Sequence, residues 1–212
     1  AIAGTPEISI AYAGDGPHVA AAAMTEVSNA VWTYQMNVPG GNDGQAEITI
    51  QGQDAAGNDV GVHSGHTFIV DNTPPTVAVS YEAGDGDTSG PFRDADTVTV
   101  TVVFTDASTI TGTPRLSIDY AGGEGSDVVL VDMSATGDNQ AWTHDIDVPS
   151  SNDGEAVITI QGQDAAGNDV ADHTGNAFIV DNTPPTVALT YDDAGPYRDA
   201  DTVLVTATFT DD

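Results

Sequence analysis

Residues 97–105 read TVTVTVVFT, in which apolar and hydroxyl side chains alternate. Successive side chains of a β-strand point to opposite faces, so this period is typical of a strand that is buried on one side only. The threonines are expected to face solvent, as one face of an antiparallel sheet commonly does. No segment of the chain has a helical period. The buried face of this strand would consist of Val98, Val100, Val102 and Phe104.

Further segments on both sides of this stretch have the same strand character. Clusters of Gly, Asp, Asn and Pro separate them, and these residue types favour turns. Short strands joined by such turns are typical of an antiparallel β-sandwich. The sequence therefore predicts an all-β protein with seven strands in a complete domain, the other six being residues 76–81, 115–120, 127–133, 141–148, 156–164 and 177–180.

The sequence repeats itself over most of its length. Residues 50–60 (IQGQDAAGNDV) recur as residues 160–170, and residues 68–78 (FIVDNTPPTVA) recur as residues 178–188. Self-similarity of this kind is the signature of tandem structural units, in which each repeat folds as one unit beside the next. We therefore expect at least two copies of the same sandwich.

The positions of the repeats predict three parts. We expect a repeat lacking its first strands at 1–70, a complete repeat at 71–180, and the first strands of a following or neighbouring-chain repeat at 181–212. Two arrangements fit this order. The chain is either a segment of a longer tandem array, or a subunit whose C-terminal strands complete the next subunit by donor-strand complementation. The expected partners are neighbouring repeats or identical subunits.

The order of the repeated motifs resembles that of the bacterial Ig-like repeats of giant extracellular adhesins and surface fibres. The motifs are FIVDNTPPTV at 68–77, RDADTV at 93–98, Trp142 at the start of a strand, and ITIQGQDAAGN at 158–168. The resemblance implies tandem Ig-like sandwiches that act mainly as extender modules of a stalk at the cell surface. It also implies calcium at or near the linkers, as in cadherin-like domains.

The charge of the chain limits its partners. It carries 33 acidic side chains against 3 basic ones, which gives a formal net charge of -30. Such a polyanion repels nucleic acid and anionic membrane surfaces. No apolar stretch is long enough to span a membrane, and the absence of cysteine excludes disulfides and thiol catalysis. Two sources of the acidity stay open, namely calcium sites and adaptation to concentrated salt.

A candidate calcium loop starts at Asp85. Asp85, Asp87 and Ser89 supply oxygen atoms at alternate positions, Gly90 follows, and Asp96 supplies a further carboxylate. This is the ligand spacing of an EF-hand loop, although the flanking sequence is strand-like. The alternative is a polar hairpin loop with solvated side chains.

The linkers are a second candidate metal site. Asp71 and Asn72 precede two prolines, and Asp181 and Asn182 repeat this arrangement. The prolines restrict the backbone, so the linker is expected to be a semi-rigid spacer. The Asp-Asn pair resembles the acidic linker that binds calcium between cadherin domains. The alternative is a turn in which these side chains bond to nearby backbone groups.

A third candidate is the repeated sequence DAAGND. It starts at Asp54 in the first copy and at Asp164 in the second, and it follows a predicted strand. It is typical of a β-turn, which is the alternative to a metal site. The turn could face the linker aspartate at the same end of the sandwich, so we expect a shared calcium site there.

The sequence favours a structural role. It contains no G-x-S-x-G motif, P-loop or dinucleotide fingerprint, so we expect no enzyme. The primary prediction is a calcium-stiffened extender of an extracellular adhesin or fibre. The alternatives are a filament subunit joined by strand exchange and a ligand-binding adhesin module, although the loops that differ between the copies are poor in aromatic residues.

Overall fold

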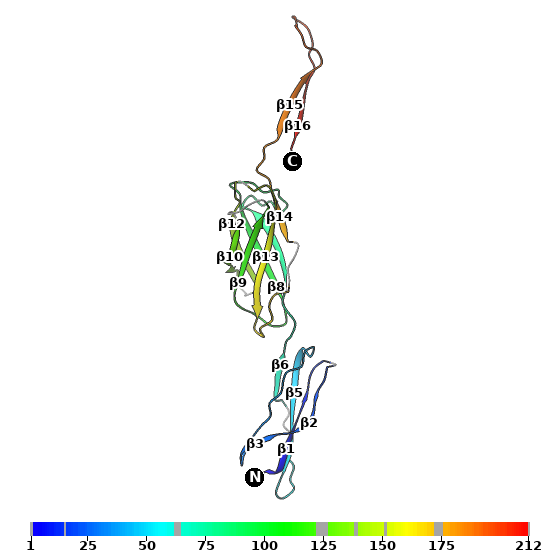
Figure 1. Ribbon diagram of the computed structural model, residues 1–212, viewed down its shortest axis with the longest axis vertical. Helices are drawn as coiled ribbons and strands as arrows, with labels where there is room; N and C mark the ends of the chain where they lie inside the picture. The colour runs from blue at the N-terminus through cyan, green and yellow to red at the C-terminus, as the bar shows by residue number, and fades with distance from the viewer. Residues whose placement is uncertain are drawn as a thin grey trace.

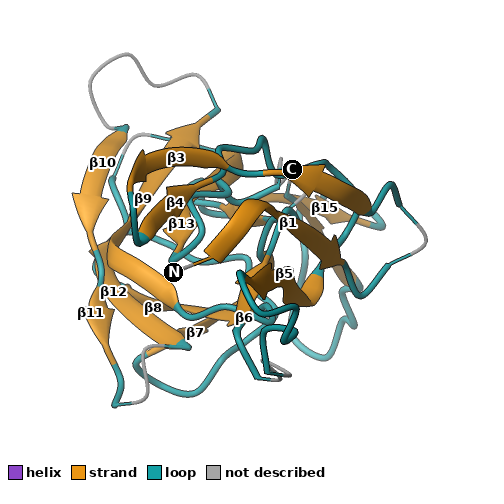
Figure 2. Ribbon diagram, turned by 90° about the horizontal axis from the view of Figure 1, so that it is seen from below, coloured by secondary structure: helices purple, strands orange, loops and turns teal. Residues whose placement is uncertain are grey.

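The computed structural model describes residues 2–14, 16–61, 65–121, 127–137, 140–150, 152–171 and 176–211. All regular structure in these ranges is β-strand, and they contain no helix (Figure 2). The prediction of an all-β protein is confirmed. Figure 1 shows N-terminal strands, a central sandwich and a C-terminal hairpin following one another along the longest axis.

The central sandwich consists of two four-stranded antiparallel sheets. Its strands are β7 (Thr76–Ala83), β8 (Thr97–Thr105), β9 (Ile110–Tyr120), β10 (Val128–Asp132), β11 (Ser134–Ala135), β12 (Ala141–Asp147), β13 (Gly154–Asp164) and β14 (Ala177–Val180). One sheet has the order β11-β12-β8-β7, and the other has the order β10-β9-β13-β14. This is the antiparallel two-layer arrangement of an Ig-like sandwich.

The core of the central sandwich lies between these two sheets. Strand β8 pairs with β7 on one side and β12 on the other, so it is the inner strand of its sheet. The predicted buried face is confirmed, because its three valines and Phe104 are almost completely inaccessible to solvent. The opposite sheet contributes further core residues, including Leu116, Ile118, Ile158, Ile160 and Phe178, and Trp142 and Ile146 of β12 also belong to the core.

The central sandwich contains one short strand that the sequence did not predict. Residues 127–133 were expected to form a strand, and β10 lies within this range and pairs with β9. β11 follows outside the range and pairs with β12 in the other sheet. The chain changes sheets at Met133, whose side chain is buried in the core. The sandwich therefore has eight strand segments instead of seven, since a side chain that enters the core ends the pairing on one sheet and starts it on the other.

The N-terminal part repeats one sheet of the central sandwich. Its strands are β1 (Ile2–Ala11), β2 (Val19–Ala23), β3 (Thr25–Ser28), β4 (Val31–Thr33), β5 (Gly44–Asp54) and β6 (Thr67–Val70). They form a sheet of order β2-β1-β5-β6 and a separate β3–β4 pair. A smaller core lies on the sheet, and its buried residues are Ile8, Ile10, Tyr12, Ala46 and Val70.

The C-terminal part is a two-stranded hairpin of β15 (Thr186–Tyr191) and β16 (Val205–Thr210). Every residue of both strands is exposed. The boundaries of the three parts at residues 70 and 180 stay a prediction. No helix long and apolar enough to cross a bilayer occurs among the described residues.

Candidate metal centre

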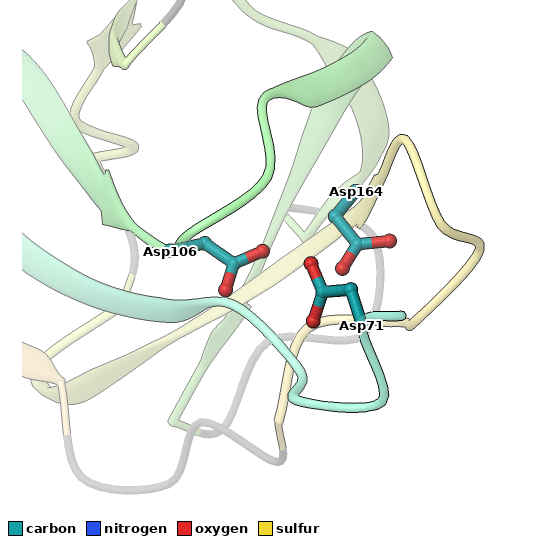
Figure 3. A group of neighbouring side chains, drawn as sticks. All are labelled: Asp71, Asp106 and Asp164. Atoms are coloured by element: carbon teal, nitrogen blue, oxygen red, sulfur yellow. The ribbon is translucent and has the colours of Figure 1, made fainter. Parts of the chain in front are cut away.

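Three aspartates meet at the end of the central sandwich that adjoins the N-terminal part (Figure 3). Asp71 follows β6, Asp106 follows β8, and Asp164 ends β13. One carboxylate oxygen from each lies within 4.8 Å of the others. Within the described ranges, no other set of three or more His, Cys, Asp or Glu side chains is grouped in this way. The structure thus brings together Asp71 and Asp164, which the sequence indicated, and adds Asp106.

Asp164 is fully buried and closes the turn after β13. Its Oδ1 accepts hydrogen bonds from the backbone N–H groups of Gly167 (2.7 Å) and Asn168 (2.8 Å), and its Oδ2 accepts one from Asn168 Nδ2 (2.8 Å). Burial alone would raise the pKa of Asp164, but these hydrogen bonds outweigh burial and leave the pKa below its ordinary value. Asp54 closes the same turn after β5 through Asn58 N and Nδ2, both at 2.9 Å.

Asp71 attaches the linker to the central sandwich. Its Oδ2 accepts a hydrogen bond from Ser108 Oγ, and its Oδ1 accepts one from the backbone N–H of Thr73 at 3.1 Å. Its carbonyl oxygen accepts a further bond from Asn168 Nδ2 at 3.1 Å. Asn168 therefore contacts both Asp71 and Asp164, and it joins the linker to the turn after β13.

Asp106 is the unsatisfied member of the cluster. Its Oδ2 is buried and has no hydrogen-bond donor within the described part of the chain. Burial raises the pKa of Asp106, and repulsion from Asp71 and Asp164 raises it further. A buried acceptor without a donor is costly, and here it lies beside two other carboxylates. The folded protein therefore disfavours the ionised form of this side chain unless a positive charge joins the cluster.

The donor set of the cluster suits a hard cation. All three side chains offer oxygen, and no His or Cys takes part. Ca²⁺ and Mg²⁺ prefer such oxygen ligands, whereas Zn²⁺ in structural sites favours Cys and His. A divalent cation bound to the cluster would offset the repulsion among the three carboxylates, and so would a proton shared between Asp106 and Asp164.

The predicted loop at Asp85 uses its side chains within itself. Asp85 Oδ1 accepts a hydrogen bond from Asp87 N at 3.1 Å, and Asp87 Oδ1 accepts two from Ser89, from N and Oγ, both at 2.9 Å. The bonds from Ser89 lower the pKa of Asp87. Asp96 closes a separate turn by accepting from Arg93 N at 2.9 Å. These side chains form no three-carboxylate group in the described residues, and calcium binding there stays a prediction.

The linker residue Asn72 is held by an aspartate that sequence reasoning did not select. Asp43 Oδ1 accepts hydrogen bonds from Asn72 N (2.8 Å) and Nδ2 (2.9 Å), and its Oδ2 accepts one from Thr73 Oγ1. Since Asp43 precedes β5, these bonds connect the linker to the N-terminal part. The linker is therefore attached on both sides, through Asn72 to one neighbour and through Asp71 to the other.

The second linker repeats this attachment. Asp153 Oδ1 accepts a hydrogen bond from Asn182 N, and its Oδ2 accepts one from Thr183 Oγ1, both at 2.6 Å. Asn182 Oδ1 in turn accepts from the backbone N–H of Asp94 at 2.5 Å, and Asp181 Oδ1 accepts from Thr183 N at 3.0 Å. The repeated sequence Asn-Asp-Gly before β5 and β13 was the signal for this contact.

We expect the junctions to loosen when Asp43 and Asp153 lose their charge. Hydrogen bonds from Thr73 to Asp43 and from Thr183 to Asp153 lower the pKa of each carboxyl below its ordinary 3.8. A lowered pKa stabilises the folded arrangement above that ordinary value, and the contribution is lost as the pH falls through the folded pKa. The Asp43→Ala, Asp153→Ala double variant at pH 7 should therefore show the broadened interdomain distance distribution that the unsubstituted chain acquires only when the pH falls below the lowered folded pKa values of these two carboxyls.

Small-angle X-ray scattering measures this distribution. The matched control is Asp119→Ala with Asp145→Ala, which removes the same charge from strands of the central sandwich and should leave the profile unchanged. Equal profiles for the junction variant and the unsubstituted chain at pH 7 would show that these aspartates do not hold the linkers.

The fold and the paired junctions define a protein of tandem Ig-like sandwiches. The chain belongs to the family described as bacterial Ig-like domain (group 3), whose sequence model matches residues 30–173 and 140–207. No curated protein matches the chain. Bacterial Ig-like domains are common in extracellular and surface proteins, and the family is typically non-enzymatic. Membership indicates a module of the extracellular adhesin type.

Proposed function

We propose that this chain is an extender segment of an extracellular adhesin or fibre at the cell surface, stiffened by calcium where its repeats join. The observation that carries the proposal is the cluster of Asp71, Asp106 and Asp164. One member belongs to the linker and two belong to the sandwich. An ion bound to all three would fix the direction in which the linker leaves the sandwich.

The charge of the chain supports this role for a cation. At a net charge of -30, neighbouring repeats repel one another, and each folded repeat is destabilised by its own acidic groups. Asp106 adds a local cost, because its buried oxygen has no donor. Calcium would offset both the repulsion between repeats and the local cost at Asp106. The partners of this chain in the proposed role are neighbouring repeats of the same protein.

Calcium is expected to raise the melting temperature of the central sandwich. A ligand that binds only the folded state stabilises it by about 3 kcal/mol at 100 times its dissociation constant, which corresponds to a shift of about 10 °C or more for a domain of this size. The fluorescence of Trp142 reports this sandwich specifically once the other tryptophan is removed by Trp32→Phe. Melting curves in EDTA, calcium, and sodium chloride at matched ionic strength then measure the effect.

The Asp106→Asn variant distinguishes stabilisation by a bound calcium ion from general screening of the acidic charges. The substitution removes a repulsive charge, so the melting temperature in EDTA should stay equal or rise. The rise in melting temperature on adding calcium should fall to a small fraction of that of the unsubstituted chain. Asp119→Asn removes the same charge from the exposed face of β9 and should keep the full gain. A gain that survives Asp106→Asn, or that sodium chloride reproduces, would contradict the calcium site and favour a salt-adapted surface.

A further inference from the structure

A polar groove lies on the outer face of the β10-β9-β13-β14 sheet of the central sandwich. Its volume is about 610 Å³, which is within the usual range of small-molecule sites. The groove follows the two inner strands, β9 and β13, which lie beside each other along the side of the sandwich (Figure 1). None of the three cluster aspartates lines it. Its polar side chains include Thr111, Thr113, Arg115, Thr159, Gln161 and Gln163.

An irregularity in β9 shapes this groove. The pairing of β9 with β13 passes from Arg115 opposite Gln161 to Thr111 opposite Gln163, so three residues of β9 are opposite one residue of β13. One of the three is Gly112, whose φ of +70° favours glycine. Such bulges bend a strand and redirect its side chains, and they are common beside functional sites. The extra residues therefore widen the space between the outward side chains of the two strands.

Arg115 is the fixed cation of the groove. Its Nη2 donates a hydrogen bond to the carbonyl oxygen of Leu130 at 2.5 Å, and its Nε lies 3.4 Å from Asp132 Oδ1. Within the described part of the chain, its Nη1 has no acceptor. Because a guanidinium is a rigid planar fork, anchoring two nitrogens also fixes the third. Arg115 therefore offers oriented N–H donors to the groove that it lines.

The carbonyl that anchors Arg115 belongs to a strained residue. Leu130 has a φ of +39°, a conformation that residues with a side chain rarely adopt. It lies where the pairing of β10 with β9 shifts, between Val128 and Val131. Backbone strain of this kind persists only where the surrounding structure imposes it, and it is concentrated at functional sites. Here it accompanies the hydrogen bond that positions the guanidinium.

The N-terminal repeat provides an internal comparison. Its strands β1 and β5 pair with the same irregularity, but Glu7 takes the position of Arg115 and is opposite Gln51. Ala23 takes the position of Asp132. No residue of β2 has a positive φ. The cation, the carboxylate beside it and the strained carbonyl thus occur together in the central sandwich and are absent together from the first copy. This joint change indicates a role that belongs to the central sandwich alone.

The rest of the groove supplies hydrogen-bonding groups without a strong charge. Gln163 Nε2 donates to Gly167 O and Asp169 Oδ1, both at 3.1 Å, which fixes the amide and leaves its oxygen as an acceptor. Among the described residues, the side chains of Thr159 and Gln161 have no hydrogen-bond partner. Hydroxyl and amide groups both donate and accept. A ligand that matches them carries many groups that also do both, as the hydroxyls of a sugar do.

Charge and topology exclude other ligand classes. The carboxylates of Asp132 and Asp169 outnumber the guanidinium of Arg115, and the chain as a whole repels anions. An extended peptide commonly adds to an open sheet edge, whereas β9 and β13 are inner strands. None of the described residues that line the groove is aromatic, so it offers no ring for a flat apolar ligand.

We infer that this groove binds a neutral oligosaccharide. Arg115, Gln161 and Thr159 contact its hydroxyl groups, and Asp132 is a positioning residue that acts through Arg115. The inference goes beyond the extender role, because it gives the side of the stalk a ligand of its own. It does not rest on calcium, since the cluster of Asp71, Asp106 and Asp164 lies outside the groove.

Isothermal titration calorimetry on the 212-residue chain in EDTA tests the inference. The probes are neutral hexasaccharides of glucose, mannose, galactose and N-acetylglucosamine, and at least one is expected to bind at one site per chain. Arg115→Ala and Gln161→Ala should each weaken this binding about tenfold or more. Glu7→Ala and Gln51→Ala, at the same positions of the first copy, are the matched controls and should leave it unchanged.

Two further variants separate hydrogen bonding from charge and from folding. Arg115→Lys keeps the charge but not the planar fork, so it should lose about as much affinity as Arg115→Ala. Asp132→Ala should weaken binding to a smaller extent, because Leu130 still holds one nitrogen of the guanidinium. Neither substitution should change the melting temperature of the central sandwich, since both side chains are exposed.

The remaining outcomes distinguish the inference from the proposed function. Failure of all four hexasaccharides to bind, or binding that survives Arg115→Ala and Gln161→Ala, would overturn the inference. Binding of a galacturonate hexasaccharide or an uncharged peptide in place of the neutral sugars would overturn the ligand class. If sugar binds but calcium leaves the melting temperature unchanged, the inference stands and the calcium-stiffened junction fails. The reverse result would remove the groove and leave the proposed function intact.

Discussion

Phe178→Ala is expected to lower the free energy of unfolding of the central sandwich by about 3–5 kcal/mol. The side chain is 1% exposed and contacts the rings of Tyr81, Phe92 and Tyr120. Its removal leaves a cavity between the two sheets that neighbouring rings fill only in part, so lost burial and lost ring contacts add together. Urea denaturation followed by Trp142 fluorescence in the Trp32→Phe background measures the loss.

Phe68→Ala is the matched control for this prediction. Phe68 occupies the same position of the repeat, but it is only partly buried and, among the described rings, contacts Tyr12. In a dilute solution of single chains, Phe68→Ala should therefore lower the free energy of unfolding of the N-terminal part much less than Phe178→Ala lowers that of the central sandwich. It should leave the unfolding of the central sandwich unchanged. Equal losses at the two positions would mean that the N-terminal sheet is already covered.

Asp164→Ala is expected to destabilise the central sandwich by about 2–4 kcal/mol, in EDTA as well as in calcium. The carboxylate accepts three hydrogen bonds from Gly167 and Asn168 in a fully buried position. Without the acceptor, these donors have no partner in a region that water does not reach freely. The turn after β13 would then lose its closure, and Asn168 would no longer hold the linker carbonyl of Asp71.

The same denaturation experiment in EDTA checks this value. Asp54→Ala removes the corresponding acceptor from the first copy, where the hydrogen-bonded turn is exposed and water can replace the lost bonds. It should leave the unfolding of the central sandwich unchanged. If Asp164→Ala is harmless in EDTA and harmful only in calcium, the residue is a metal ligand without a structural role in the turn.

The strand positions could be predicted from sequence because the period of two is a local property. Val98, Val100 and Val102 are buried as the alternation indicated, since each side chain faces the core whenever the strand pairs at all. The short strand β11, which follows Met133 in the other sheet, could not be predicted. It depends on which of two sheets offers the next edge, and that is a property of the assembled sandwich.

In the candidate site, too, the residues marked by local sequence motifs could be predicted, whereas those that depend on the assembled structure could not. Asp71 and Asp164 could be selected because their motifs recur and both follow strands at one end of the domain. Asp106 was missed, although its recurrence as Asp211 after the same Phe-Thr pair was an available signal. Asp43 was missed because its bonds to Asn72 and Thr73 span 29 and 30 residues and follow from the geometry of the junction.

The two linkers leave the central sandwich from strands in different sheets. β7 follows one linker and pairs along its whole length with β8, from Thr76 opposite Thr105 to Ala83 opposite Val98. β14 precedes the other linker and belongs to the opposite sheet. A pulling force applied through both linkers therefore loads the β7–β8 hydrogen bonds in shear, so that they must break together instead of opening one by one from an end. The hydrogen bonds of β7 with β8 thereby resist tension applied along the long axis of the sandwich.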